Sequence, residues 1–339
     1  MAILDDNNSG VAAGFGRDPL AELDAELERL RIELGESPEE KHAEIKRPGI
    51  VKRITALMLA IICAALLLCA CGEDKTDVSP TEPTQLPTVI VNDSELGTIS
   101  LLPPEDASVN TYSTANLTLD DNGYYTYTVD GVKVSEMGVD LSENQEGIDF
   151  DAMKESGIDF VMLRIGGRGY GSGKLYADSA FDTFYQQAKD AGLKIGAYFF
   201  SQAIDRDEAA EEAQYALSLL DGRELDYPIA FDWEYFDEDE ARTDHISGPQ
   251  VTLMAAAFCD TVEEGGYSSI VYANTSMILQ EYDFDVMKGY DFWLADYREL
   301  PEQDAMYYHF SMWQYTDSGV IPGYEYPVDL NLCLQANHH

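Results

Sequence analysis

The chain has 339 residues and a formal net charge of −42 at pH 7, from 63 Asp and Glu against 21 Lys and Arg. This length is enough for one large domain with appendages. A surface with such a charge repels nucleic acid, so we expect no nucleic-acid partner. Residues 72–339 hold 13 Lys and Arg against 51 Asp and Glu, so most of the charge follows residue 71.

The cysteines do not form a disulfide framework or a metal-ligand pattern. Cys63, Cys69 and Cys71 lie in or beside one apolar run, which leaves Cys259 and Cys333 for the rest of the chain. The histidines form no ligand cluster with them either. We therefore expect no metal and no cofactor.

Residues 1–50 are polar and acidic, and residues 51–71 contain a membrane-targeting pattern. Lys46, Arg47, Lys52 and Arg53 precede Ile54–Ala70, an uncharged run of 17 residues. This run is short for a relaxed membrane span and long for the apolar core of a signal peptide. The basic flank predicts that residues 1–50 stay in the cytoplasm and that the bulk of the chain lies outside the cell.

Two kinds of anchor fit this segment. It is either an uncleaved signal-anchor, or a lipoprotein signal in which Leu68-Cys69-Ala70-Cys71 resembles a lipobox and Cys71 becomes lipidated. Both place the protein at the cell membrane with its main domain extracellular.

Residues 72–135 read as a flexible linker with one short β-hairpin. From Gly72 to about Asn110 the chain is rich in Pro, Thr, Ser and acidic residues, which is typical of an extended spacer. Tyr124–Val134 has alternating strand-forming residues around Asp130-Gly131, which predicts the hairpin.

Residues 136–335 alternate between strand and helix patterns and form the predicted main domain. Strands are expected at Met137–Leu141, Phe160–Ile165, Lys194–Ser201, Pro228–Glu234, Ser268–Asn274, Asp291–Tyr297, Tyr308–Tyr315 and Pro327–Cys333. Helices are expected at about Phe150–Ser156, Ser179–Ala191, Asp207–Leu220 and Gln250–Glu264. Eight such strands with helical crossovers predict an α/β fold, a parallel (β/α)8-type barrel. Its later crossovers are too short for full helices, so its C-terminal half should be irregular.

The fourth of these strands ends in the pair Asp232 and Glu234, separated only by Trp233. Residues two apart on a strand point to the same side, roughly 7 Å apart. Two neighbouring carboxylates raise each other's pKa, so one can remain protonated near neutral pH. A carboxylic acid and a carboxylate beside one bond are the usual equipment for hydrolysing a glycosidic linkage.

Polar residues recur at the ends of the other strands, where a barrel of this kind gathers its catalytic groups. Because such groups are costly within apolar runs unless they are paired or used, we expect them to line one site. They are Asp140, Arg164, Tyr198, Ser201, Tyr272, Asn274, Asp296, Gln314 and Asp329.

Six segments, in order, resemble glycoside hydrolase family 25, the lysozyme family of N-acetylmuramidases. The resemblance extends over roughly residues 136–335, and the acidic positions show no departure. The segments are Gly138–Gln145, Gly192–Phe199, Phe231–Glu234, Phe292–Tyr297, Trp313–Tyr315 and Val328–Asn331.

This resemblance implies a flattened, irregular barrel that cleaves the β-1,4 bond between N-acetylmuramic acid and N-acetylglucosamine in peptidoglycan glycan strands. Glu234 would be the general acid, and Asp232 would stabilise the cationic centre or orient the acetamido group. Asp140 and Asp329 would complete an acidic floor. Substrate-binding side chains would be Arg164, Tyr198, Tyr272, Trp293, Asp296 and Gln314, in a monomeric catalytic domain.

Two other functions stay open. A chitinase-like barrel also ends its fourth strand in D-x-E, but it expects more acidic residues before the pair, where Tyr227, Pro228 and Ala230 stand here. A catalytically silent glycan-binding domain would be expected to lack an acid. The glycine-rich stretch Gly166–Lys174 departs from phosphate-loop spacing and is expected to be a mobile loop at the rim.

Overall fold

The computed structural model describes residues 88–235, 241–298 and 307–334, which all fall within one structural unit. The expected cytoplasmic tail, the apolar run Ile54–Ala70 and Cys71 lie outside the described residues. Within the part that is described, no helix has both the length and the apolar character to cross a membrane.

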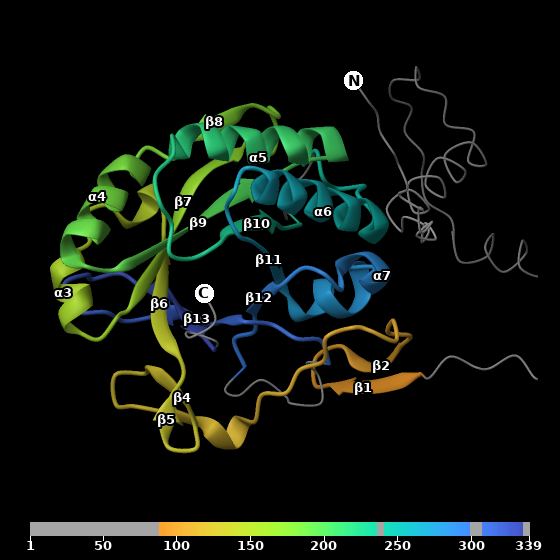
Figure 1. The fold of residues 1–339 in the computed structure, drawn as a ribbon, viewed down its shortest axis with the longest axis horizontal. Coiled ribbons are helices and arrows are strands. Elements are labelled where there is room, and N and C mark those ends of the chain that lie inside the picture. Colours follow the sequence, from red (N-terminus) through yellow and green to blue (C-terminus); the bar gives the residue numbers. More distant parts are fainter. Residues whose placement is uncertain (1–87, 236–240, 299–306, 335–339) are drawn as a thin grey trace, which may run out of the picture. The chain divides into compact units, whose positions relative to one another are not determined.

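Eight strands of one sheet close into a barrel, because the first strand pairs with both the second and the last (Figure 1). The predicted strand Lys194–Ser201 is confirmed with the same bounds, and the other seven are present with shifted ends. The barrel strands are β6 (Glu136–Leu141), β7 (Phe160–Arg168), β9 (Lys194–Ser201), β10 (Ile229–Trp233), β11 (Ser269–Asn274), β12 (Phe292–Ala295), β13 (Met312–Gly319) and β14 (Val328–Cys333).

The last strand departs from the expected parallel barrel. Neighbouring strands from β6 to β13 run parallel, but β14 is antiparallel to both β13 and β6. Residues 320–327 connect β13 to β14 through turns, and so short a connection returns the chain in the opposite direction. The start of β14 therefore lies at the edge of the barrel where the other strands end.

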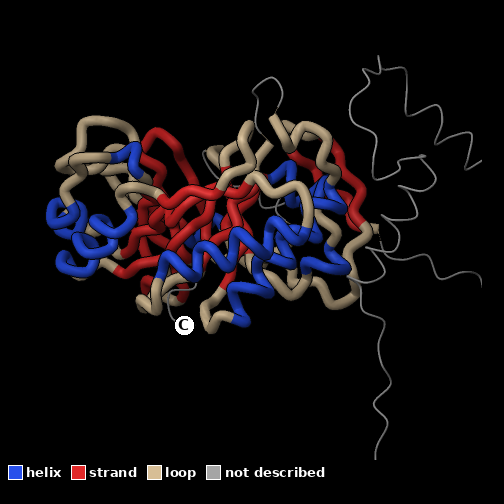
Figure 2. The backbone as a smooth tube through the Cα atoms, turned by 90° about the horizontal axis from the view of Figure 1, so that it is seen from above, coloured by secondary structure: helices blue, strands red, loops and turns tan. Residues whose placement is uncertain are grey.

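Helices cover one side of the barrel, and each expected helix is present. In Figures 1 and 2, α5 and α6 lie side by side over the strands β7, β9 and β10. The helices are α3 (Phe150–Glu155), α4 (Phe181–Ala191), α5 (Arg206–Leu220), α6 (Gly248–Glu264) and α7 (Phe284–Met287).

Local sequence signals fix the helix ends. Asp205 caps α5 by accepting a hydrogen bond from the backbone N–H of Glu208 at 2.9 Å. Ser247 and Gln250 form a capping box before α6, with a proline in the first turn. Gly192 ends α4 with φ of 72°, a left-handed conformation that glycine adopts without strain.

The apolar core has two parts, inside the barrel and between the barrel and its helices. Inside, the ring of Phe160 stacks on Tyr227 with centroids 4.3 Å apart. Gly138 faces the Phe160 ring so closely that a side chain at position 138 would collide with it. The barrel is thus filled by side chains at one end, which leaves only its other end for a site.

Residues 88–134 are folded. The prediction of an extended spacer that reaches about Asn110 is therefore wrong for the residues from 88 onward. The strands are β1 (Val89–Asp93), β2 (Gly97–Leu101), β3 (Leu117–Leu119), β4 (Tyr125–Val129) and β5 (Val132–Lys133), so the hairpin predicted at Tyr124–Val134 is confirmed. The signal missed was the alternation of Val89, Val91, Ile99 and Leu101, of which Val91 and Leu101 are buried.

This N-terminal segment packs against the barrel beside β12 and β13. The backbone N–H of Asn110 donates to Tyr307 at 2.8 Å, and the rings of Tyr125 and Trp313 are 5.1 Å apart. Figure 1 shows β1, β2, β4 and β5 on the side of the barrel opposite α5 and α6. The segment therefore covers strands that the large helices leave open.

The glycine-rich stretch Gly166–Lys174 was also interpreted wrongly in part. Gly166, Gly167 and Arg168 continue β7 and pair with the added strand β8 (Leu175–Ala177). A side chain at position 166 or 167 would meet Tyr176, so these glycines allow close approach of two strands. Arg168 is buried rather than exposed on a loop.

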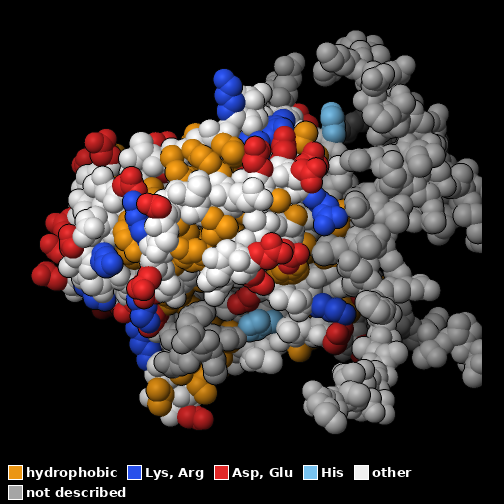
Figure 3. All heavy atoms as spheres, turned by 45° about the horizontal axis from the view of Figure 1, so that its top comes forward, with side chains coloured by type: hydrophobic (Ala, Val, Ile, Leu, Met, Phe, Trp, Pro, Cys, Tyr) orange, Lys and Arg blue, Asp and Glu red, His pale blue; other side chains and the backbone are white. Residues whose placement is uncertain are grey.

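Charged side chains on the face shown in Figure 3 are of both signs and surround a gathering of hydrophobic side chains. The acidic residues are not collected into a single patch on this face. The simplest role for the net charge of −42 is to keep the protein soluble, and the mixed charges on this face agree with that role.

Candidate active site

A cleft of about 290 Å³ opens at the end of the barrel where strands β6 to β13 finish. Its walls come from inward-facing positions of successive strands, which alternate with outward-facing positions. The strand-end residues Ser201 and Asn274 do not line this cleft, but nine of the ten side chains predicted for catalysis or substrate binding do. They are Asp140, Arg164, Tyr198, Asp232, Glu234, Tyr272, Trp293, Gln314 and Asp329.

Asp232 and Glu234 form the first of two acidic pairs in the cleft. Asp232 is 6% exposed, and the two side chains share a hydrogen bond. Burial, and then the charge of Glu234, raise the pKa of Asp232 well above its usual value. Burial also raises the pKa of Glu234. The pair therefore retains one proton at a pH where isolated carboxyls would be ionised.

One oxygen of this pair has no internal partner. Oδ1 of Asp232 is buried and accepts no hydrogen bond within the described residues. A buried acceptor without a donor is costly, and native proteins rarely tolerate one without a reason. Asp232 is one of the residues that line the cleft, so a bound molecule is the source from which we expect a donor for this oxygen.

Asp140 and Asp329 form the second pair, one on β6 and one on β14. They are directly opposite each other in the antiparallel ladder, and their side chains share a hydrogen bond. Burial, and then the charge of Asp329, raise the pKa of Asp140 well above its usual value. Burial raises the pKa of Asp329 also. This pair too retains a proton, with a single negative charge between its members.

Amide side chains hold Asp140 in place. Oδ2 of Asp140 accepts hydrogen bonds from Nε2 of Gln314 at 2.9 Å and from Nδ2 of Asn331 at 2.8 Å. Oε1 of Gln314 in turn accepts from the phenol groups of Tyr272 at 2.8 Å and Tyr297 at 2.7 Å. Gln314 thus connects the acidic floor to two tyrosines of the wall.

Arg164 is the basic side chain in the wall of the cleft. Its Nε donates to Oδ2 of Asp178 at 2.7 Å, and its Nη2 donates to Oε1 of Glu143 at 3.1 Å. With its two carboxylate partners the guanidinium is fixed in position and largely neutralised. It presents a rigid polar edge to the cleft rather than a free positive charge.

Aromatic rings form the remaining wall. Trp293 makes edge-to-face contacts with Tyr272 at 4.9 Å and with Tyr198 at 6.2 Å between ring centroids. Nε1 of Trp293 donates to Oδ1 of Asn331 at 2.8 Å, which fixes the indole. Rigid aromatic faces beside polar groups suit the apolar faces and hydroxyls of a sugar.

Asp296 is the predicted substrate-binding residue that does not line the cleft. Its position has the opposite parity from Trp293 and Ala295, so it points away from the barrel interior. Its carboxylate instead pairs with Arg298, which also donates from Nη1 to Oδ2 of Asp93 at 2.8 Å. Asp296 thus helps to fasten the β1–β2 hairpin to the barrel.

Five of the described residues that line the cleft were not predicted as site residues. Tyr297 has the inward parity that Asp296 lacks, so counting in twos from Trp293 would have found it. Phe200 follows Tyr198 in the same way. The other three belong to the turn after β6, whose shape the sequence does not reveal; they are Ser142, Asn144 and Gln145. Among the described residues, no group of three or more His, Cys, Asp or Glu is placed to hold a metal ion.

Comparisons with known proteins point to one family. The model of glycosyl hydrolases family 25 matches residues 139–324, more than half of the chain. The autolytic lysozyme of Clostridium acetobutylicum is 32% identical over 195 residues, which are 57% of this chain and 54% of that protein. The chain therefore spans about half the length of this curated relative.

Solved structures give the same result for the fold. The spore cortex lytic enzyme SleM of Clostridium perfringens has a TM-score of 0.51 and 26% identity, over 59% of this chain and 67% of that one. The modular autolysin LytC of Streptococcus pneumoniae has a TM-score of 0.52 and 22% identity, over 64% of this chain and 52% of that one. Because the identity to LytC is only 22%, that similarity shows the fold alone.

Proposed function

Because the chain belongs to glycosyl hydrolases family 25, we propose that it hydrolyses the β-1,4 bond between N-acetylmuramic acid and N-acetylglucosamine in peptidoglycan. The observation that supports this most strongly is the presence of two proton-retaining carboxyl pairs in a single cleft, Asp232 with Glu234 and Asp140 with Asp329. Hydrolysis of a glycoside needs one group to give a proton and another to stabilise positive charge.

Glu234 is the general acid in this proposal. Because the pKa of Asp232 is raised well above its usual value by burial and by the charge of Glu234, we place the shared proton on Asp232 before substrate binds. A substrate N–H that donates to the unpartnered Oδ1 of Asp232 stabilises the ionised form of that residue. The shared proton then belongs to Glu234, which is the protonation state that the reaction requires.

The substrate's own acetamido group is the natural donor. When Asp232 holds the acetamido N–H of N-acetylmuramic acid, the carbonyl oxygen of that group can bond to C1 of the sugar. The C1–oxygen bond to N-acetylglucosamine breaks, and the leaving oxygen takes the proton of Glu234. A water molecule, deprotonated by Glu234, then opens the cyclic intermediate and leaves a new reducing end on N-acetylmuramic acid.

The second acidic pair supplies a negative charge that stabilises the transition state. One negative charge shared by Asp140 and Asp329 faces the same cleft and favours the cationic character that develops at C1. Gln314 and Asn331 fix Asp140 through its Oδ2, so this charge is placed before the substrate arrives.

The chemical identity of the product tests the proposal. Purified peptidoglycan is digested with the protein, the new reducing ends are reduced with borohydride, and the reduced sugar is identified by mass spectrometry. We expect reduced N-acetylmuramic acid. Reduced N-acetylglucosamine would assign a different bond, and the absence of any new reducing end would favour a glycan-binding domain.

For localisation, we propose that the segment Ile54–Ala70 holds the protein at the cell membrane with the barrel outside. The support is the sequence pattern alone, with its basic residues before the apolar run. An external barrel would lie on the same side of the membrane as the wall. The signal-anchor and the lipoprotein with modified Cys71 remain the two forms of this proposal.

A further inference from the structure

The turn that follows β9 lies directly beside the end of β10, where the proposed acid is. Trp233 and Ser201 are the last residue pair of these two parallel strands, so Glu234 and Gln202 are the next positions of each chain. Gln202 is completely buried and does not line the cleft. It therefore cannot be a direct partner of the substrate.

The side chain of Gln202 bonds to the backbone of Glu234. Its Nε2 donates to the carbonyl oxygen of Glu234 at 3.3 Å and to that of Ser201 at 3.0 Å. Its Oε1 accepts from Oγ1 of Thr243 at 3.2 Å. The carbonyl of Glu234 lies beyond the last ladder pair of β10, so Gln202 supplies a donor that the sheet does not.

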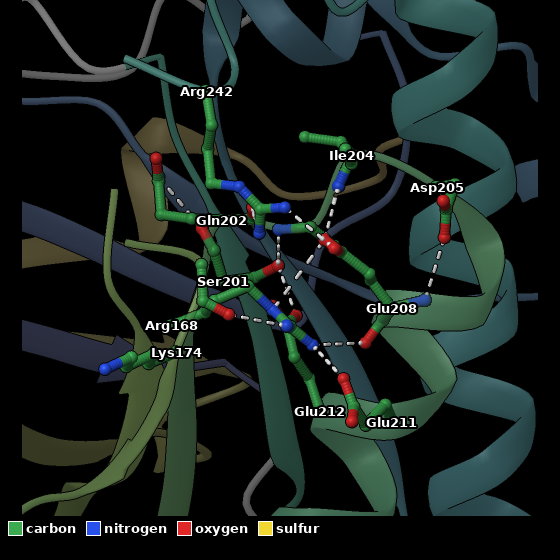
Figure 4. A network of polar contacts seen from close by, with 12 residues as sticks. Arg168, Lys174, Ser201, Gln202, Ile204, Asp205, Glu208, Glu211, Glu212 and Arg242 are labelled. Atoms are coloured by element: carbon green, nitrogen blue, oxygen red, sulfur yellow. Dashed lines mark hydrogen bonds and ion pairs between the residues drawn. The ribbon is translucent and has the colours of Figure 1, made fainter. Parts of the chain in front are cut away.

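The backbone of Gln202 is itself held on both sides (Figure 4). Its N–H donates to the buried carboxylate of Glu212, and its carbonyl oxygen accepts from Nη1 of Arg242 at 3.0 Å. Glu212 is fixed by Nε of Arg168 at 2.7 Å and by Oγ of Ser201.

Two further features show that the network encloses the segment carrying Glu234. Nε1 of Trp233 donates to the carbonyl oxygen of Ala203 at 3.0 Å, so the turn after β9 holds the residue before Glu234 as well. Arg242 and Thr243 belong to the segment that returns after Glu234, and both donate to Gln202. Gln202 thus joins the strand before the acid to the chain after it.

We propose that Gln202 is a positioning residue that fixes the backbone of Glu234 and thereby aims its carboxyl group at Asp232 and at the leaving oxygen. The proposal rests on the role of Glu234 in the proposed function. A displacement of a catalytic group by about 1 Å can lower a rate about 10²-fold, so a buried clamp on its backbone has a large effect on turnover.

The first test compares Gln202→Leu with Thr252→Val. Leucine removes the amide at similar size, whereas Thr252 is an equally buried polar residue on α6 that bonds to Gly248 and does not line the cleft. We expect Gln202→Leu to lower kcat by about 10²-fold with little change in KM, because substrate contacts remain. We expect Thr252→Val to leave kcat and KM unchanged. An unchanged kcat in folded Gln202→Leu would overturn the proposal.

The substitution Gln202→Glu tests the hydrogen bond itself. An ionised glutamate has no donor for the Glu234 carbonyl, but a protonated one has an O–H that can replace the amide N–H. The activity of this variant relative to wild type should therefore rise as pH falls. A ratio that is constant with pH would contradict the assignment of the donor to Nε2.

Thr243→Val serves if neither Gln202 variant folds. It removes only the hydroxyl that donates to Oε1 and keeps the shape of the side chain. We expect a smaller decrease in kcat, again with little change in KM. An unchanged kcat in this variant would overturn the proposal.

A measurement without substrate separates this proposal from the proposed function. Carboxyl carbons are followed by NMR as a function of pH in wild type, in Gln202→Leu and in Thr252→Val. The titration of Glu234 should move only in Gln202→Leu, because its distance to Asp232 changes. If wild type releases no sugar, the proposed function fails, and this titration still decides whether Gln202 places Glu234. An identical titration in all three proteins would overturn that placement.

Discussion

Asp329 lies directly opposite Asp140 across the antiparallel ladder of β14 and β6, and the two carboxyl groups share a hydrogen bond. In a fully parallel barrel Asp329 would start its strand at the closed end, away from the cleft. The reversal of β14 is therefore what brings this residue to the acidic floor. This barrel thus completes its cleft with a strand that runs antiparallel to both of its neighbours.

The pH dependence of stability should reveal the Asp140–Asp329 pair. The pKa of Asp140 is raised from 3.8 in the fold, so the folded protein holds a proton that the unfolded chain releases. Its stabilising contribution is present at low pH and is lost as pH rises through the raised value. Asp140→Asn resembles the protonated form at every pH, because its N–H can donate to Asp329.

We therefore expect Asp140→Asn to be more stable than wild type at neutral pH, with a difference that shrinks toward about pH 4. Each unit of raised pKa corresponds to about 1.4 kcal/mol. Urea unfolding at several pH values measures this difference. A difference that stays constant with pH would contradict the shared proton.

The bridge between Arg298 and Asp93 should contribute measurable stability. Burial would raise the pKa of Asp93, but the backbone N–H groups of Leu96 and Glu95 and the guanidinium of Arg298 lower it overall. Asp93→Asn keeps an acceptor for the backbone and loses the charge that faces Arg298. We expect a loss of about 1–3 kcal/mol in the free energy of unfolding at neutral pH.

Asp106→Asn is the matched control for this bridge. Asp106 pairs with Lys288 between the same two parts of the chain, but its side chain is 70% exposed. Exposed ion pairs contribute little to stability because water screens their charges, so denaturant unfolding should detect little change. Equal effects of the two substitutions would show that burial of the Arg298 bridge is unimportant.

Gln314 should contribute to activity mainly through its bond to Asp140. Gln314→Glu keeps acceptor oxygens for Tyr272 and Tyr297 but loses the N–H donor to Asp140 and adds a charge beside it. We expect a loss of about 1.5–3 kcal/mol in transition-state stabilisation from kcat/KM on soluble glycan fragments. Tyr297→Phe removes one phenol and should cost less. The reverse order of effects would assign the main role to the tyrosine.

The strands were predictable because their apolar runs are short, separated and followed by polar residues. Asp232 and Glu234 could be placed on one face from their spacing alone. The prediction for Asp296 is wrong because a polar residue at a strand end does not by itself reveal which way it points, and the alternation along the strand favours Tyr297 instead. The direction of β14 depends on how residues 320–327 turn, and no periodicity records that.

The sequence pattern does not predict contacts between residues that lie far apart in the chain. The glycines around Arg168 predict a loop, yet Arg168 pairs with Glu212, which is 44 residues away in the chain. The β1–β2 hairpin was hidden among polar residues, and it is fastened by Arg298, far along the sequence. Such pairs arise only when the barrel has closed.

The position of the protein in the cell is a separate prediction that uses Cys71. After fractionation, wild-type protein should be in the membrane with the barrel accessible to external protease. Cys71→Ser should abolish lipidation and processing if the protein is a lipoprotein, and should change nothing if Ile54–Ala70 is a signal-anchor. Wild-type protein in the cytoplasmic fraction would contradict both forms of the proposal.

The most direct measurement for the whole account is the rate at which Glu234→Gln releases reducing sugar from purified peptidoglycan. Glutamine has the size of glutamate but cannot give the proton, so the rate should fall by at least about 10²–10⁴-fold in a folded protein. Glu264→Gln, the same change at an exposed position of α6, should leave the rate unaltered. A Glu234→Gln rate close to that of wild type would contradict the assignment of the acid.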